Sequence, residues 1–329
     1  MVPVLNKSPH KRIATLDIAR IVCIILVVIG HYDPSDAPLC YTNMLKVIYT
    51  FHMPVFLFIS GYLYINIQKE ETFTSFIIKK IKRLAIPYFV TSAIIITIKL
   101  LSQGGVRVDH PVTALSYLKM FYLPEAGYFL WFIIALFVMF VVVFFFKTKV
   151  ARLVLFGLSF IVSFLPSCGI DVFCLRQVQE MMVYFMTGVV IADYVPGLIK
   201  IGVVPTIVIL LTFIGCEAYY VHHQDSMFMY RLLAYLGIVA IMTLCHNCER
   251  YLPLLARSCV VLAPSVYVIY LFHTSIEGFS KSFFEKVPLF DDFTTQAVIT
   301  IALAVVLPIL IHHFVLKRNA VTKFLFGLS

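Results

Sequence analysis

The chain has 329 residues, of which 61% are hydrophobic and only 13% are charged. Soluble domains carry about 25% charged residues, so this composition excludes a soluble globular protein and indicates a polytopic membrane protein. The formal net charge of +9 fits the Lys and Arg that collect in cytoplasmic loops, so it does not indicate a nucleic-acid partner.

Ten apolar segments follow one another along the chain, and a membrane-spanning helix needs roughly 20 such residues. The segments are 13–32, 45–65, 84–102, 128–146, 151–166, 180–195, 201–221, 230–245, 259–277 and 295–316. Turn-forming sequences such as "DPSDAP" and "YVPG" separate them, and no loop is long enough for a separate folded domain. We therefore expect an all-α transmembrane bundle of about ten spans that forms a single domain over residues 1–329. The segments 151–166, 180–195 and 230–245 are the short ones.

The basic residues indicate how this bundle is oriented. If the N-terminus is cytoplasmic, 17 of the 26 Lys and Arg residues lie in cytoplasmic segments and 7 lie in outer ones. The cytoplasmic set includes Lys7, Lys11, Arg12 and Lys69, and the outer set includes Arg107. This bias predicts that both termini are cytoplasmic and that the number of spans is even.

The first predicted span, "LDIARIVCIILVVIGHY", carries an arginine and a histidine. Arg20 and His31 are 11 residues apart, so they share one helix face and lie about 16 Å apart along the axis. Asp17 can pair with Arg20 at the i, i+3 spacing. Ionisable residues within a span face the bundle interior or an aqueous cavity, and they indicate a functional site. The structural alternative is that Arg20 snorkels to the inner boundary and that His31 lies among headgroups.

The second predicted span, "YTFHMPVFLFISGYLY", carries His52 in its outer half and Pro54 two residues later. The proline predicts a kink or a local opening of the helix. With His31 also in the outer half, His52 indicates a site that opens outward, and the alternative is a satisfied polar residue at a kink. Ser60 and Gly61 are interpreted as small residues that permit close helix packing.

The eight cysteines show no disulfide or metal framework. Cys245 and Cys248 form a single CxxC without the second pair that a zinc site needs, so we expect ordinary thiols and no metal. Cys168 and Cys174 share one short loop, where both a disulfide and two free thiols are possible.

Motifs spread over most of the chain resemble those of the acyltransferase family 3 membrane O-acyltransferases, particularly the branch of fucose 4-O-acetylases and polysaccharide modifiers. The motifs are Arg20 and His31 separated by ten residues, "FHMPVFLFISGYLY", "KKIKRLAIPYF", "YFLWFIIALF", and "SVYVIYLFH", which ends at His273. Family members often carry two arginines three residues apart before the third span, where this chain has Lys80 and Arg83.

The resemblance implies an O-acetyltransferase of the bacterial cytoplasmic (inner) membrane. It would move an acetyl group from cytoplasmic acetyl-CoA to a sugar hydroxyl of a lipid-linked or polymeric cell-surface glycan. Histidine suits the general base, because its ordinary pKa of about 6.5 lies near the working pH. We favour His31 as this base, and His52 could orient it, bind acceptor hydroxyls or stabilise the oxyanion. A covalent acyl-histidine intermediate is the alternative.

Basic and aromatic residues supply the candidate binding groups. Arg83, Lys80 and Arg20 are candidates for the CoA phosphates or the pantetheine arm, although a single lysine near a span end can equally contact lipid headgroups. His273, Trp131 and Glu180 are candidates for the acceptor. The alternatives are packing or interfacial anchoring for Trp131 and helix capping for Glu180.

Two other classes of protein fit the same composition. Ten spans with charged interior residues would suit a glycan or small-molecule exporter, and histidines within spans would suit a membrane sensor or scaffold that responds to pH. A requirement for acetyl-CoA separates the enzyme from both.

Overall fold

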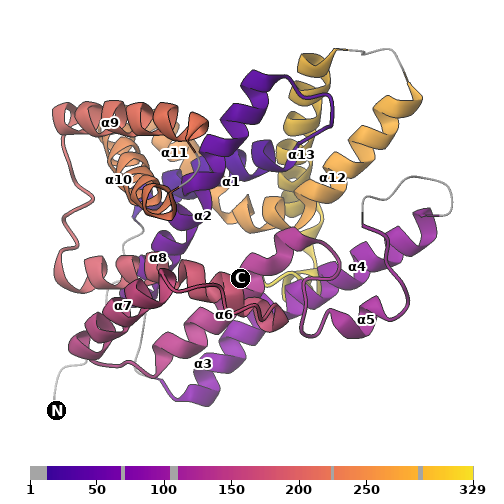
Figure 1. Ribbon diagram of the computed structural model, residues 1–329. Helices are drawn as coiled ribbons and strands as arrows, with labels where there is room; N and C mark the ends of the chain where they lie inside the picture. The colour runs from indigo at the N-terminus through magenta and orange to yellow at the C-terminus, as the bar shows by residue number, and fades with distance from the viewer. Residues whose placement is uncertain (1–12, 68–70, 104–109, 224–225, 288–291, 329) are drawn as a thin grey trace.

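The computed structural model describes residues 13–67, 71–103, 110–223, 226–287 and 292–328, and within these ranges the chain forms helices without a strand (Figure 1). The α-helices are α1 (Ala14–His31), α2 (Leu39–Ile67), α3 (Phe73–Lys80), α4 (Ile86–Ser102), α5 (Ser116–Lys119), α6 (Trp131–Phe144), α7 (Lys149–Ser163), α8 (Leu175–Tyr194), α9 (Val203–His222), α10 (Met227–Tyr251), α11 (Pro253–Leu262), α12 (Val266–Lys286), α13 (Phe293–Phe314) and α14 (Ala320–Leu325). Shorter turns are the π-helical η1 (Ile81–Ala85) and the 3-10 turns η2 (Tyr128–Leu130), η3 (Val172–Cys174), η4 (Ala263–Ser265) and η5 (Leu316–Arg318). The predicted all-α fold is confirmed.

Each of the ten predicted segments falls on a helix, but only some of these helices are long and apolar enough to cross a membrane. Among the described residues, seven helical stretches are long and apolar enough: α1, α2, α3 with α4, α9, α10, α11 with α12, and α13. The stretch Tyr128–Phe144 is apolar but shorter, and α7 has 15 residues. Ten spans and two cytoplasmic termini stay predictions. Of the basic residues counted for orientation, Lys7, Lys11, Arg12, Lys69 and Arg107 lie outside the described residues.

The long helix α2 lies at the centre of the bundle and packs against α1, α8 and α10. A Cβ added to Gly61 would lie 1.9 Å from the carbonyl oxygen of Phe185 on α8, and one added to Gly188 would lie 2.0 Å from that of Phe58. The two backbones can approach this closely only because both positions are glycine, which confirms the packing prediction for Gly61. The helix continues through Pro54 without interruption.

Ion pairs and capping groups fix several helix ends. Arg152 on α7 makes a bidentate pair with Asp193 on α8, with Nε–Oδ2 and Nη2–Oδ1 distances of 2.6 and 2.9 Å. The Glu249 carboxylate on α10 accepts the backbone N–H of Thr15 at 3.0 Å, which caps the start of α1. Arg231 on α10 donates to the carbonyl of Ser163 at the end of α7. These contacts hold the N-terminus of α1 and the α7–α8 pair in fixed positions.

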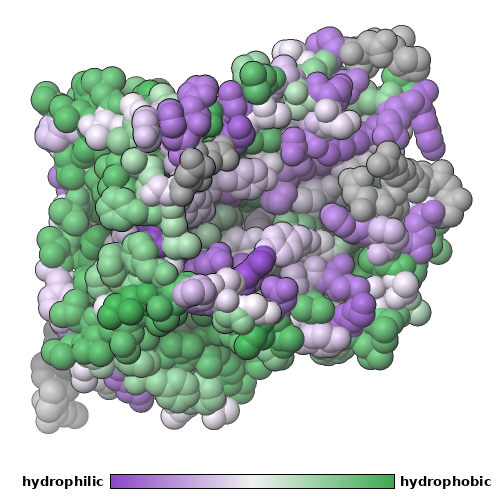
Figure 2. Space-filling model, viewed as in Figure 1, coloured by the Kyte–Doolittle hydropathy of each residue, from purple (hydrophilic) through white to green (hydrophobic). Residues whose placement is uncertain are grey.

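Apolar side chains cover the left and lower parts of the face in Figure 2, and hydrophilic ones gather toward the upper right. The C-terminal ends of α4 and α12 lie on that right-hand side in Figure 1. The peripheral helix α9 exposes Val204, Val208 and Leu211. Such a surface is unfavourable in water and favourable against lipid acyl chains.

Candidate functional site

Two of the predicted histidines meet at the C-terminal end of α1. His31 is the last residue of α1 and is half-buried. The centre of its imidazole ring lies 5.0 Å from that of His273 on α12, with the ring planes at 58°. The Phe129 ring on η2 lies 6.2 Å from His31 and 5.3 Å from His273. Residues from three distant parts of the sequence therefore form one cluster.

The two fully buried histidines have a defined tautomer. His273 Nδ1 lies 2.8 Å from the carbonyl oxygen of Tyr270, and His52 Nδ1 lies 2.6 Å from that of Ile48. A carbonyl oxygen only accepts, so Nδ1 carries the proton in each ring, and Nε2 is an acceptor in the neutral imidazole. His52 is 3% exposed and His273 0%. His31 is thus the accessible member of these three.

Tyr49 connects His52 to the same end of α1. Its ring lies 5.3 Å from the His52 ring, and its hydroxyl donates to the carbonyl of Gly30 at 2.6 Å. Gly30 directly precedes His31 in the chain. His52 is therefore a neighbour of the cluster through Tyr49.

The aromatic stretch at the start of α6 reaches the histidines through Phe129. The hydroxyl of Tyr270 donates to the Phe129 carbonyl, which ties η2 to α12. Trp131 is half-buried, and its ring meets that of Phe132 edge-on at 6.1 Å. The role of Trp131 in acceptor binding stays a prediction. Phe129 makes the direct ring contacts with His31 and His273.

An acidic and a basic residue follow His273 on α12 and were not among the residues predicted for the site. Glu277 lies one turn after His273 and is 3% exposed. Lys281 lies one turn further, with its Nζ 5.6 Å from the centre of the Tyr32 ring. The i, i+4, i+8 spacing from His273 places all three on one helix face, and this spacing is the signal that could have identified them.

Arg20 lies toward the N-terminal end of α1, on the helix face that it shares with His31. Its Nη1 lies 3.5 Å from Asp17 Oδ1, as the spacing predicted. Its side chain is 31% exposed, so the guanidinium remains accessible to a ligand. The helical rise places it about 16 Å along the axis from His31.

Of the candidate phosphate-binding residues, Lys80 directly precedes the π-helical turn and Arg83 lies within it. The Lys80 Nζ lies 3.2 Å from the centre of the Phe140 ring, so its ammonium group makes a cation–π contact. Arg83 is exposed on η1. The turn precedes Pro87, which has no N–H to donate to the Arg83 carbonyl, and the helix widens there. Arg83 is better placed than Lys80 to contact an external anion.

Glu180 lies within α8, and the two loop cysteines form no disulfide. α8 begins at Leu175, so Glu180 lies too far into the helix to cap it, and its carbonyl accepts from Arg231 at 3.2 Å. Cys168 and Cys174 are both free thiols. Within the described ranges, no group of three or more His, Cys, Asp and Glu residues could hold a metal ion.

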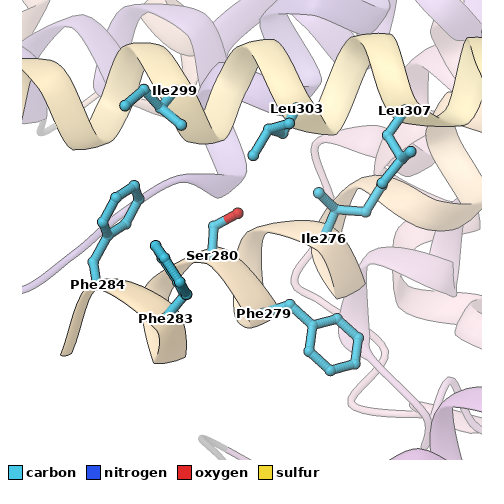
Figure 3. Close-up of a pocket in the computed structure, with 8 residues that line it drawn as sticks. All are labelled: Ile276, Phe279, Ser280, Phe283, Phe284, Ile299, Leu303 and Leu307. Atoms are coloured by element: carbon cyan, nitrogen blue, oxygen red, sulfur yellow. The ribbon is translucent and has the colours of Figure 1, made fainter. Parts of the chain in front are cut away.

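An open apolar groove of about 440 Å³ runs between α12 and α13 (Figure 3). Phe279 and Phe283 line it from α12, and Leu303 and Leu307 line it from α13. The Ser280 hydroxyl is the polar group among its labelled side chains. The groove includes none of the site histidines, so it lies outside the candidate catalytic cluster.

The cluster combines an accessible imidazole, two buried imidazoles, of which His273 has an Nε2 without a hydrogen-bond partner, and a remote guanidinium. This combination suits proton transfer beside a bound anion. A family model described as an acyltransferase domain matches residues 13–313, a range that contains all of these residues. No curated protein and no solved structure matches the chain.

Proposed function

We propose a specific reaction for this chain, which belongs to acyltransferase family 3 and is a membrane acyltransferase. It transfers an acetyl group from cytoplasmic acetyl-CoA to a sugar hydroxyl of a lipid-linked or cell-surface glycan, in the bacterial cytoplasmic membrane. The observation that carries this proposal is the half-buried His31 ring 5.0 Å from the His273 ring at the end of α1.

His31 acts as the general base in this reaction. Its imidazole takes the proton from an acceptor hydroxyl, and the oxygen attacks the thioester carbonyl carbon. The tetrahedral intermediate collapses with cleavage of the C–S bond, and the leaving thiolate takes the proton back from the imidazolium. General-base catalysis of this kind contributes about 10²- to 10⁴-fold in rate.

The donor is held by the basic residues at the other end of the bundle. The exposed guanidinium of Arg83 binds a CoA phosphate, since its planar fork matches phosphate oxygens. Arg20 contacts the pantetheine arm or a phosphate closer to the reaction. The span of about 16 Å between Arg20 and His31 suits a long flexible arm that carries its thioester toward the histidines.

The test uses the purified full-length protein in detergent or liposomes, with acetyl-CoA labelled in the acetyl group and a glycan acceptor. The proposal expects label in the glycan as an alkali-labile ester, with release of one free CoA thiol per ester. If wild type forms no ester and its loss alters glycan export in cells, the chain is an exporter and the proposal is wrong.

A further inference from the structure

Two buried polar atoms on α12 have no hydrogen-bond partner, and both belong to the face that meets His31. They are Nε2 of His273 and Oε1 of Glu277. The two side chains are 0% and 3% exposed, so bulk water does not satisfy them. Buried polar groups are nearly always paired, and such a pair of exceptions one turn apart needs an explanation.

The chemistry of these two atoms restricts what can fill the site. His273 already donates through Nδ1 to backbone carbonyls, so its Nε2 can only accept in the neutral ring. The Glu277 carboxyl accepts through its free oxygen, and it can also donate when protonated. A hydroxyl can donate and accept, so it satisfies both positions in either protonation state.

The charges around the site argue against ionic ligands. An anion would place its acceptor oxygens against the Glu277 carboxyl and the free His273 nitrogen. A cation would meet Lys281, which interacts electrostatically with both Glu277 and His31. An uncharged ligand with several hydroxyls avoids both conflicts.

Three tyrosines lie in the same region of the molecule as Glu277. The hydroxyls of Tyr32, Tyr41 and Tyr49 all interact electrostatically with its carboxyl, and the Thr300 hydroxyl lies beside that of Tyr32. Tyr41 donates to the carbonyl of Ile29 at 2.9 Å, which fixes its ring against the last turn of α1. Tyrosine side chains therefore lie in the region of Glu277, and two of them are held against the end of α1 by hydrogen bonds to its backbone.

We propose that Glu277 and His273 form a subsite that binds two hydroxyls of a sugar or other polyol, with Glu277 as its specificity-determining residue. This inference rests on the proposed function, because it places the acceptor beside His31. The contact between the His31 and His273 rings puts a hydroxyl held at His273 next to the base. The subsite thereby selects the hydroxyl that reacts.

The test measures binding separately from acyl transfer. The full-length protein in detergent is heated with methyl glycosides of glucose, galactose and fucose, and with myo-inositol, and its unfolding temperature is followed. The variants are Glu277→Gln and the matched control Glu217→Gln. Glu217 on α9 is also 3% exposed, and its Oε2 is also without a partner. Gln at that position keeps an oxygen that can accept from Thr50.

At least one of these polyols should stabilise wild type and Glu217→Gln. Its Kd should rise about tenfold in Glu277→Gln, because an amide offers one acceptor oxygen and forms weaker hydrogen bonds than a carboxyl group with two oxygens. In the acyl-transfer assay, the KM for the acceptor should rise while the KM for acetyl-CoA is unchanged. Absence of polyol binding to wild type, or equal binding by Glu277→Gln, would overturn the subsite and leave a His31-dependent transfer intact. Polyol binding that depends on Glu277, without any acyl transfer, would retain the subsite and contradict the proposed function.

Discussion

At the scale of single residues, the proposed site has an arginine at one end of α1 and a histidine at the other. The spacing of Arg20 and His31 in the sequence was enough to place them on one face, and the Asp17 pair formed as expected. The contact of His31 with His273 could not be predicted, because spacing along one helix says nothing about the register between two helices. The spacing of Glu277 from His273 could be read in the sequence, but its lack of a hydrogen-bond partner depends on what faces it in the fold.

Arg20→Ala should weaken donor use specifically. Loss of a hydrogen-bonded arginine contact to an anionic donor should raise the KM for acetyl-CoA about 10- to 100-fold, and the KM for the acceptor should change little. Arg250→Ala is the matched control, because Arg250 is exposed and packs on Tyr251 at the end of α10. Steady-state kinetics with each substrate varied in turn would measure both values. An unchanged KM for acetyl-CoA in Arg20→Ala would remove Arg20 from the donor site.

At the scale of the elements, apolar length predicted the helices well and their ends less well. α2 begins at Leu39 and α8 at Leu175, several residues before the predicted starts at 45 and 180. Polar and mixed residues continue these helices past the apolar runs, and tertiary contacts stabilise such turns. The π-helical turn was not predicted either, although Pro87 marks the place where the α-helical bonding must change.

The crossing of α2 and α8 should be intolerant of any added methyl group. Gly61→Ala places a Cβ within 1.9 Å of a backbone carbonyl on α8, so the helices must separate. We expect a loss of about 1–3 kcal/mol in the free energy of unfolding, or more. Gly157→Ala on α7 has no atom within 4 Å of the added Cβ, and its higher helix propensity should stabilise by up to about 1 kcal/mol. Thermal unfolding in detergent would compare them, and equal stability of the two variants would contradict the close packing.

At the scale of the whole molecule, a buried ion pair joins α7 to α8. The side chains of Arg152 and Asp193 are 8% and 3% exposed. Asp193→Leu should destabilise by about 3–5 kcal/mol, because it leaves a buried guanidinium without its partner. The double change Arg152→Met with Asp193→Leu should recover much of this loss. Equal destabilisation of the single and double variants, measured by chemical unfolding, would show that the pair is not coupled.

The orientation of the bundle can be tested with the cysteines that it already contains. Cys40 and Cys168 are exposed, and the distribution of Lys and Arg predicts that both lie on the outer side. A membrane-impermeant maleimide applied to intact cells should therefore label wild type, and the double variant Cys40→Ser with Cys168→Ser should lose this labelling. Labelling of Cys40 and Cys168 only after the cells are permeabilised would reverse the orientation, with both termini outside.

The central claim is that His31 is the base in acyl transfer from acetyl-CoA, and the acyl-transfer rate of His31→Ala tests it most directly. The rate of acetyl incorporation into glycan should fall by about 100-fold or more relative to wild type, at equal amounts of folded protein. His223→Ala is the matched control, since His223 is exposed and stacks on Tyr219, and it should keep the wild-type rate. A wild-type rate in His31→Ala would contradict the account.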